Sequence, residues 1–391
     1  MPDNLGAISY YRPHYPRFSE AEYRRRYALV RSEMAAHGVD CLVVTGDMGM
    51  NAELMADVHW LSNWNCTASQ GFVVFPFDAE PTLFCALFVY RPNALARSVI
   101  EDVRAGADVA SRIRELKGTH LTVGMVGPFP HDVVEDMKSK LPGARFVPCG
   151  DWFGELRRAR SAEEVEWLEK GAAFADIGMD AMVKAIRPGV TERQLYAATV
   201  NAVLEAGGTF SFQWIGSTPM SRPMMVYPSP EPSNRMLEKG DLVITEIAAG
   251  YEWMSGQINR CVAVGQDPPE EYLRLHELTV RLYHDMCAAL KPGASPAEVA
   301  TAAAPLLEAG YMLDFMAIGR PTGASTPPVL PVTPPGPYFE RPFVENESVM
   351  ILPMPYKRAD ELGIFLGNLV LVAKGGATSL QKYPLDEFLV V

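Results

Sequence analysis

Between Gly240 and Arg260 the sequence reads GDLVITEIAAGYEWMSGQINR. Its residues that could take part in catalysis or bind a substrate are Glu246, Gln257 and Asn259. The alternation and the central Gly-Tyr-Glu-Trp predict a strand, a turn and a second strand. Glu246 falls within the apolar first strand, where burial of a carboxyl group raises its pKa toward the range of general acid–base catalysis. Glu246 is therefore the candidate catalytic residue. The alternative is a structural carboxylate tied to an arginine.

Two amides follow on the second predicted strand. Gln257 and Asn259 flank Ile258, so their side chains point to the same face. Buried amides need hydrogen-bond partners, and a polar substrate would provide them. We therefore expect both to bind substrate, together with Ser229. The alternative is that the amides pair with each other, or with Ser229 and Ser255.

Two arginines are further candidates for substrate binding. Arg320 stands in the glycine-rich turn IGRPTG, where it would either bind a substrate carboxylate in bidentate fashion or neutralise Glu246. Arg260 directly follows Asn259. It would either contact substrate or have a structural role, paired with a carboxylate or a strand carbonyl.

Aromatic and methionine residues cluster in the segment FSFQWIGSTPMSRPMMVYP, residues 210–228. Such clusters usually fill cores. These occupy predicted loops rather than periodic helix faces, which favours a pocket for a substrate with an apolar or aromatic portion. The candidate pocket residues are Trp214, Tyr227, Trp253, Met220, Met224, Met225 and Met254.

The elements that position these residues divide the chain in two. Up to residue 158, a helix over 19–38 opened by Ser19 is followed by the predicted strands 39–46, 70–76, 81–90 and 121–127. This alternation predicts an α/β domain with a mixed sheet. A long helix with Ser161 as N-cap then opens the second domain, 159–391.

The second domain contains an internal sequence repeat. Residues 185–208 and 289–311 share a Pro-Gly, a Thr or Ser N-cap, a helix and the tail Leu-Glu-Ala-Gly. The repeat predicts two related halves facing each other across one cleft. The alternative is that both segments use a common turn, Pro-Gly before a capped helix, without being related. The Pro-rich segment 325–342 is expected to form a stiff loop at the rim of this cleft.

Composition disfavours several classes of partner. The formal charge of −12 and the pI near 5.2 disfavour nucleic acid and anionic membranes. No apolar run approaches the roughly 20 residues of a membrane span, and no secretory signal is recognisable at the N-terminus. The six cysteines form no CxxC, which is typical of reduced thiols. We expect a cytoplasmic protein.

Several segments carry a resemblance over nearly the whole chain. They are RSAEEVEWLEKGAAFAD, the two Pro-Gly helices, PSNRMLEKGDLVITE, INRCVAVG, ESVMILPMPY and NLVLVAKGGATSLQKYP. The chain thereby resembles the creatinase / prolidase / aminopeptidase P (M24-type) family. The resemblance implies a creatinase-like N-terminal domain and a C-terminal pita-bread domain made of two pseudo-repeated α–β halves.

The resemblance also shows what is missing. The family's metal ligands, two Asp, one His and two Glu, fall here on Glu246, Gln257, Arg320, Leu352 and Gly367. Hard divalent cations need several anionic or carbonyl oxygens, and an arginine would repel them. No histidine lies between residues 285 and 391 to replace the missing one, and His276 and His284 are expected to pack or be partly exposed. We therefore expect no metal and no cofactor.

The resulting functional hypothesis is a metal-independent, creatinase-like enzyme that hydrolyses a C–N or amide-like bond of a small organic substrate, with Glu246 as general acid/base. The alternatives are a lyase using a carboxylate base and a non-catalytic binding or scaffold protein. Creatine is disfavoured, because Ser229, Asn259 and Leu352 occupy the positions of creatinase's own machinery. The resemblance further implies a homodimer, in which Trp64 and His59 of the N-terminal domain are candidates to reach the partner's site.

Overall fold

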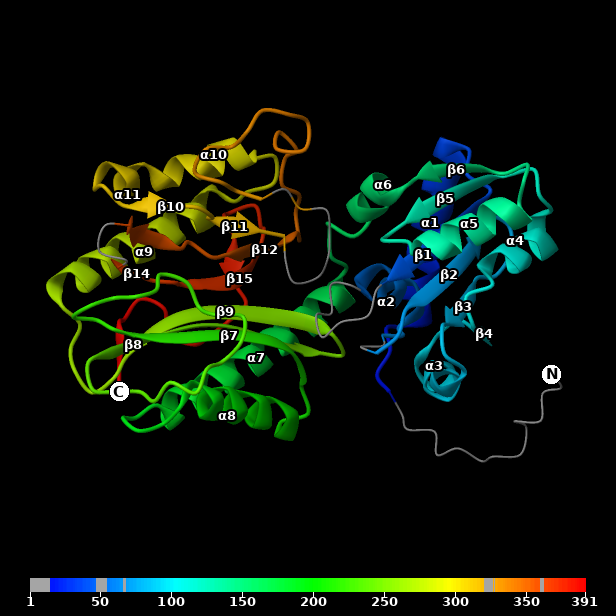
Figure 1. The fold of residues 1–391 in the computed structure, drawn as a ribbon. Coiled ribbons are helices and arrows are strands. Elements are labelled where there is room, and N and C mark those ends of the chain that lie inside the picture. The colour runs from blue at the N-terminus through cyan, green and yellow to red at the C-terminus, as the bar shows by residue number, and fades with distance from the viewer. Residues whose placement is uncertain (1–14, 47–54, 66–67, 320–325, 327, 359–361) are drawn as a thin grey trace. The chain divides into compact units, whose positions relative to one another are not determined.

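The computed structural model describes residues 15–46, 55–65, 68–319, 326, 328–358 and 362–391. The chain divides into two compact units, Met1–Leu156 and Arg157–Val391 (Figure 1). The boundary predicted between residues 158 and 159 lies close to this division. Each unit is built around its own sheet.

The first unit contains a six-stranded sheet in the order β4-β3-β2-β1-β5-β6. Its strands are β1 (Cys41–Gly46), β2 (Gly71–Pro76), β3 (Thr82–Cys85), β4 (Asp102–Ala105), β5 (Thr122–Val126) and β6 (Arg145–Pro148). The pairs β1–β2 and β2–β3 are antiparallel, whereas β1–β5, β3–β4 and β5–β6 are parallel. The predicted mixed α/β sheet is therefore confirmed.

Helices cover both faces of this sheet. They are α1 (Glu20–His37), α2 (Ala56–Ser62), α3 (Arg91–Arg97), α4 (Val109–Lys117), α5 (His131–Lys140) and α6 (Gly150–Glu155). Leu42 and Val44 of β1 belong to one apolar cluster, with residues of α1 and α2. Cys41 and Val43 belong to another, with residues of α4 and α5. Every residue of β1 is buried for this reason.

The predicted strand 81–90 is wrong over its second half. The strand β3 ends at Cys85, and Phe88–Tyr90 forms the 3-10 turn η2 that leads into α3. Pro92 in the first turn of α3 favours a helix start here. Because the chain leaves the sheet, Phe88 is 70% exposed although its sequence neighbours are apolar.

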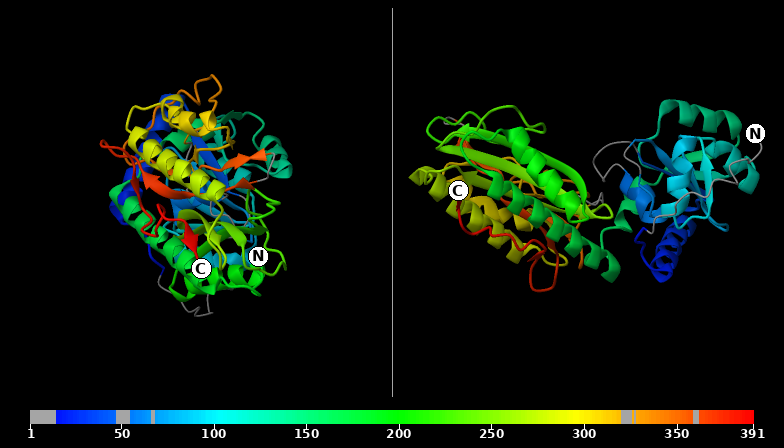
Figure 2. Two further views of the ribbon diagram at one scale, coloured as in Figure 1. Left: turned by 90° about the vertical axis from the view of Figure 1, so that its left-hand side faces the viewer. Right: turned by 90° about the horizontal axis from the view of Figure 1, so that it is seen from below.

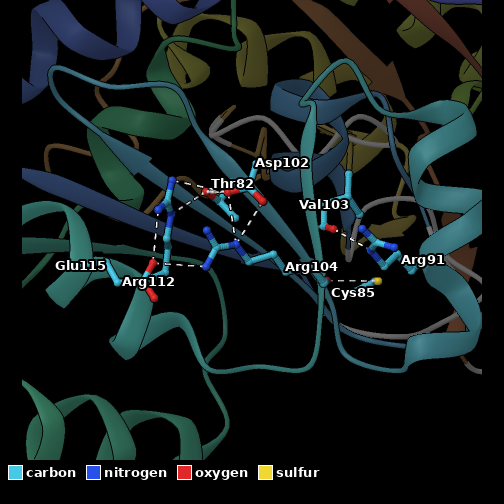
Figure 3. Close-up of polar contacts among 8 residues, drawn as sticks. All are labelled: Thr82, Cys85, Arg91, Asp102, Val103, Arg104, Arg112 and Glu115. Carbon is cyan, nitrogen blue, oxygen red and sulfur yellow. Dashed lines mark hydrogen bonds and ion pairs between the residues drawn. The ribbon is translucent and has the colours of Figure 1, made fainter. Parts of the chain in front are cut away.

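A polar network fastens the edge strand β4 (Figure 3). Asp102 accepts hydrogen bonds from Thr82 Oγ1 at 2.9 Å and from Arg104 Nε at 3.0 Å. Arg91 Nε donates to the Val103 carbonyl at 2.9 Å, and so satisfies a backbone group at the sheet edge. Charged side chains on an edge strand also discourage pairing with other chains.

The second unit contains an eight-stranded sheet and a three-stranded sheet. Six strands of the larger sheet follow the order β11-β12-β15-β9-β8-β7, and its other two strands, β16 and β17, pair with β15 and β9. The smaller sheet has the order β10-β13-β14. The strands are β7 (Thr209–Pro219), β8 (Asp241–Tyr251), β9 (Met254–Ala263), β10 (Met312–Leu313), β11 (Ala317–Ile318), β12 (Ser348–Ile351), β13 (Pro355–Lys357), β14 (Leu362–Gly363), β15 (Gly367–Leu371), β16 (Thr378–Ser379) and β17 (Leu389–Val390). This is the predicted pita-bread architecture.

The hairpin β8–β9 is the strand–turn–strand unit predicted from the sequence. Glu252 and Trp253 form its two-residue turn with φ of 46° and 71°, the left-handed conformation that matches the twist of a hairpin. Ile247 and Ile258 belong to the core beneath the hairpin, together with residues of α7 (Ala162–Ala185) and α8 (Glu192–Glu205). Figures 1 and 2 both show these helices against β7–β9.

The two copies of the internal sequence repeat form helices that are only partly alike. Capping boxes open α7 at Ser161, α8 at Thr191 and α10 at Ser295. The first copy is the single helix α8. The second breaks into α10 (Pro296–Ala300), η3 (Thr301–Ala303) and α11 (Ala304–Glu308), preceded by α9 (Glu270–Ala289). Pro305, near the start of α11, has no N–H to continue the helical ladder.

No helix within the described ranges is long and apolar enough to cross a membrane. In the Pro-rich segment, the described residues 328–342 form turns and bends, with one bridge between Val329 and Ala317. This agrees with a segment that can form neither a regular helix nor a central strand. Its expected place at the rim of the cleft stays a prediction.

Candidate active site

The carboxylate and the amides of the hairpin lie on one face. Glu246 on β8 stands directly opposite Asn259 on β9 and Trp214 on β7, so these side chains point the same way. Gln257 Nε2 donates a hydrogen bond to Glu246 Oε1. Glu246 is 7% exposed, and Gln257 and Asn259 are both fully buried. The structure therefore groups three of the predicted site residues around one buried carboxylate.

The two amides have unmatched hydrogen-bonding capacity. Among the residues that the structure describes, Gln257 Oε1 and both Asn259 Nδ2 and Oδ1 have no hydrogen-bond partner. Leaving such a group buried and unpaired costs about 1–3 kcal/mol. Because most buried polar atoms are paired, these three atoms need partners from water or from a polar ligand.

The alternative partners considered from the sequence are engaged elsewhere. Ser255 Oγ shares a hydrogen bond with Ser211 Oγ at 2.7 Å. Ser229 is partly buried, and its Oγ accepts from the Glu231 N–H at 3.3 Å. Its own carbonyl accepts from the Ile215 N–H at 2.9 Å, which holds the loop against β7.

Arg260 faces away from Glu246 and has a structural role. Its guanidinium donates to the carbonyls of Pro384 at 2.6 Å, Tyr383 at 2.9 Å and Gly367 at 2.9 Å. It is 1% exposed, and burial lowers its pKa to about 10, so it remains protonated at neutral pH. The expected substrate contact is therefore replaced by the other role considered, a cation paired with strand and loop carbonyls.

Two further positions of the family's ligand set lie next to the amides. Gly367 on β15 stands opposite Asn259 in register. A Cβ at Gly367 would lie 2.0 Å from the Ile351 carbonyl oxygen and 3.0 Å from the Cα of Leu352, so this backbone leaves no space for a side chain. Leu352 is 4% exposed. Arg320 lies outside the described residues.

The aromatic candidates separate into different places. Trp214 is 37% exposed and lies beside Glu246. Trp253 stands in the turn at the end of the hairpin, where its backbone N–H donates to Thr209 Oγ1 at 3.3 Å. The structure therefore brings Trp214, but not Trp253, to the carboxylate.

A cavity of about 380 Å³ lies next to this face. It is lined by Met224, Met225, Val226, Tyr227, Asp314, Tyr356 and Arg358. Tyr227, Met224 and Met225 were predicted to form a pocket, whereas Asp314, Tyr356 and Arg358 were not. The sequence carries no local signal for these three, because they reach the cavity from segments distant in the chain. Met220 and Met254, which were also predicted to line the pocket, are buried and do not line this cavity.

The loop that carries Ser229 and Tyr227 is anchored by another residue that sequence reasoning missed. Glu192, at the start of α8, is 3% exposed. Its carboxylate accepts hydrogen bonds from Ser217 Oγ at 2.7 Å and from Ser233 Oγ at 2.6 Å. Its only sequence signal is its place in the first turn of a capped helix, which is ordinary for an acidic residue.

The candidates of the N-terminal unit are core residues. Trp64 is fully buried, and its Nε1 donates to Asn93 Oδ1 at 3.2 Å. A Cβ at Gly71 would lie 2.5 Å from the Trp64 ring, so the indole packs against bare backbone. His59 on α2 is 7% exposed. A role for either residue in a partner's site stays a prediction.

The two histidines of α9 differ in environment. His276 is 6% exposed and packs on Phe388, with ring centroids 4.9 Å apart. Burial lowers its pKa from 6.5 to about 4, so it is neutral at physiological pH. His284 is exposed and pairs with Asp386 Oδ1 at 2.7 Å. Packing and surface pairing account for both.

Comparison with known proteins places this architecture in a family. Residues 166–374 match the sequence model of metallopeptidase family M24, and residues 26–159 match the creatinase/prolidase N-terminal domain. A Xaa-Pro dipeptidase of Pyrococcus furiosus is 28% identical, over 68% of this chain and 75% of its own. An ectoine hydrolase of Halomonas elongata is 21% identical, over 95% of this chain and 98% of its own.

Solved structures agree with this fold. The prolidase from Pyrococcus horikoshii OT3 superimposes with a TM-score of 0.76 and 20% identity, covering 92% of this chain and 99% of its own. An X-Pro aminopeptidase from Thermotoga maritima MSB8 gives a TM-score of 0.78 at 16% identity, covering 93% and 99%.

The family's name implies metal ions, and hard divalent cations require several oxygen ligands. Glu246 supplies one carboxylate and Gln257 one amide, whereas Leu352 and Gly367 supply no side-chain oxygen. Across the part of the chain that the structure describes, no group of three or more His, Cys, Asp and Glu residues is placed to hold a metal. These residues do not fit a pair of hard divalent cations. The chain is thus a hydrolase-class member of metallopeptidase family M24, with side chains at its site that differ from the metal-binding set.

Proposed function

We propose that the protein hydrolyses a C–N or amide-like bond of a small organic substrate without a metal ion, with Glu246 as general acid/base. One observation carries this proposal. A buried carboxylate, oriented by Gln257, lies beside a fully buried Asn259 whose amide is unmatched among the described residues. Such an arrangement is costly for folding and suits a polar substrate.

Each group then has a defined role. Glu246 takes a proton from a water molecule as the water oxygen adds to the substrate carbon, and returns it to the leaving nitrogen as the C–N bond breaks. Asn259 Nδ2 donates to the oxygen that gains charge. Gln257 Oε1 accepts from a substrate N–H, while its Nε2 holds the carboxylate in place.

The names of two relatives support hydrolysis as the reaction class. One relative is called Ectoine hydrolase and another Xaa-Pro dipeptidase. The donor set described above supports the metal-free part of the proposal, because the aligned positions supply too few oxygen ligands for a cation pair.

The decisive experiment uses purified protein and a panel of small amides, lactams and amidines. Turnover is expected to survive chelation, in protein with no stoichiometric Mn, Zn, Co or Fe by mass spectrometry. Glu246→Gln should lower kcat by roughly 10²–10⁴-fold. The matched control is Glu205→Gln, which neutralises an exposed carboxylate at the end of α8.

Two outcomes would contradict the proposal. One is activity that chelation removes and a divalent cation restores. The other is unchanged turnover in Glu246→Gln. Reaction in H₂¹⁸O distinguishes the lyase alternative, because hydrolysis places one ¹⁸O in the product and elimination places none. Thermal shifts with ligands but no turnover of any compound would favour the binding or scaffold alternative.

The proposal includes a homodimer. Support comes from the exposed apolar run Leu87, Phe88 and Val89, which are 51%, 70% and 56% exposed. Large exposed apolar patches mark interaction surfaces, and these three side chains are the candidates for part of one. Light scattering of the purified protein measures the mass directly, and a monomer at working concentration would remove this part of the proposal.

A further inference from the structure

The cavity beside the active-site face combines an apolar floor with two opposite charges. Met224, Met225 and Val226 supply apolar surface, while Asp314 and Arg358 supply the charges. Methionine side chains adapt to ligands of varied shape. A volume of about 380 Å³ is enough for a small metabolite.

The acidic group of this cavity is fixed in position. Asp314 Oδ2 accepts from Tyr227 Oη at 2.7 Å, and Asp314 Oδ1 accepts from Tyr356 Oη at 3.3 Å. The Tyr227 and Tyr356 rings meet edge-to-face, with centroids 5.7 Å apart. Burial and the hydrogen bond to Asp314 raise the pKa of Tyr227 far above its usual range. Tyr227 therefore remains a donor, and Asp314 an oriented acceptor.

The basic group belongs to the same network. A hydrogen bond to Tyr356 raises the pKa of Arg358, and the charge of Asp314 adds to this effect. Asp314 and Arg358 are both exposed, so water now solvates their remaining hydrogen-bonding positions. A ligand bearing one ammonium and one carboxylate group can replace that water at both ends with charge-assisted hydrogen bonds.

The cavity and Glu246 share one face of the sheet. A Cβ at Gly216 would lie 2.6 Å from Met225 Sδ, so the Met225 side chain rests on Gly216. Gly216 lies two residues along β7 from Trp214, which stands opposite Glu246. Two residues of a strand span about 7 Å. The cavity therefore lies on the same side of the sheet as the carboxylate, about two strand positions along β7 from the Trp214–Glu246 pair.

We propose that this cavity binds the dipolar, amino-acid-like end of the substrate. Its ammonium group lies against Asp314, its carboxylate against Arg358, and its apolar side chain over Met224 and Met225. The placement of the reacting bond at Glu246 rests on the function proposed above. Binding of the dipolar group does not, because it depends on the cavity alone.

Titration calorimetry with L-norleucine as the probe tests this proposal. N-acetyl-L-norleucine lacks the ammonium group, and L-norleucinamide lacks the carboxylate. Each should bind at least about tenfold more weakly than norleucine, since a hydrogen bond to a charged group contributes that much. Asp314→Asn and Arg358→Gln should weaken norleucine binding to a similar extent.

The variants also show which cavity residue binds the ammonium group of norleucine and which binds its carboxylate. Asp314→Asn should no longer distinguish norleucine from its N-acetyl form, but should still distinguish it from the amide. Arg358→Gln should show the reverse. The matched controls are Asp285→Asn and Arg281→Gln, an exposed acid and an exposed base that pair on α9. Both controls should bind norleucine as the wild type does.

Equal binding of the three compounds, or no binding of norleucine at millimolar concentration, would overturn the proposal. Unchanged affinity in both cavity variants would overturn it too. Glu246→Gln separates this proposal from the proposed function, because it should keep norleucine affinity while losing turnover. If it loses neither, the catalytic role fails and the cavity proposal stands.

Discussion

Replacing Asn259 by leucine should stabilise the protein while abolishing its activity. Asn259 is fully buried, and within the described ranges neither of its amide atoms has a hydrogen-bond partner. Two unmatched groups set an upper bound of roughly 2–6 kcal/mol on the folding free energy that Asn259 costs. Leucine shares the branching of asparagine at Cγ. Repacking around its methyl groups offsets part of the gain and leaves about 1–3 kcal/mol.

A neighbouring asparagine provides the matched control. Asn368 on β15 is 3% exposed; its Nδ2 donates to Ser379 Oγ at 3.0 Å, and only its Oδ1 is unmatched among the described residues. Asn368→Leu removes one hydrogen bond, which costs about 0.5–1.5 kcal/mol, and one unmatched acceptor, which returns about 1–3 kcal/mol, so the two effects largely offset each other. The two substitutions are chemically identical, so Asn259→Leu should stabilise the protein by more than Asn368→Leu does.

Calorimetry and urea unfolding measure both effects. In a domain of this size each kcal/mol shifts Tm by about 2–4 °C, so Asn259→Leu should raise Tm by several degrees. No gain of stability in Asn259→Leu beyond that in Asn368→Leu would refute the reasoning. It would mean that the Asn259 amide is already satisfied in the folded protein and does not await a substrate.

Two further predictions concern stability. Arg158 and Glu347 form a buried bidentate pair, with Nη2–Oε2 at 2.8 Å and Nε–Oε1 at 3.0 Å. Arg158→Met should cost about 3–5 kcal/mol, because it leaves the buried Glu347 carboxylate without its cationic partner and with the Val344 N–H still donating to it. The double variant with Glu347→Leu should cost much less. Urea unfolding measures both, and additive costs would contradict the coupling. His276 titrates at about 4 when folded, compared with 6.5 ordinarily, so the unfolded chain binds more protons between these values. Stability is therefore complete above pH 6.5 and should fall as pH drops toward 4, by an amount on the order of 3 kcal/mol. His276→Gln should flatten this part of the pH profile of Tm, and an unchanged slope would show that other groups cause it.

Local patterns were sufficient for much of this fold. The period of two around Ile258 placed Gln257 and Asn259 on one face, and the capping box at Ser161 marked the start of α7. These patterns succeed because side-chain direction in a strand and donor satisfaction at a helix start depend only on residues a few positions apart.

Local patterns failed where the partners are remote. Apolar composition predicted strand up to Tyr90, but the chain leaves the sheet after Cys85. The internal sequence repeat predicted a second helix like α8, but Pro305 interrupts that helix. Glu192 looked like an ordinary first-turn acid, and only the fold shows that it holds the loop beside the site.

The sequence by itself determined the two-part α/β plan through short-range periodicity, and its motifs carried the resemblance to the family, which in turn implied that the aligned metal positions lack oxygen ligands. The tertiary structure alone decided which polar groups meet. Arg260 is bound by carbonyls of residues more than 100 positions away, and the cavity joins Tyr227 to Asp314, 87 positions later in the chain. Such contacts depend on how whole elements pack, and no local pattern of residues records that packing.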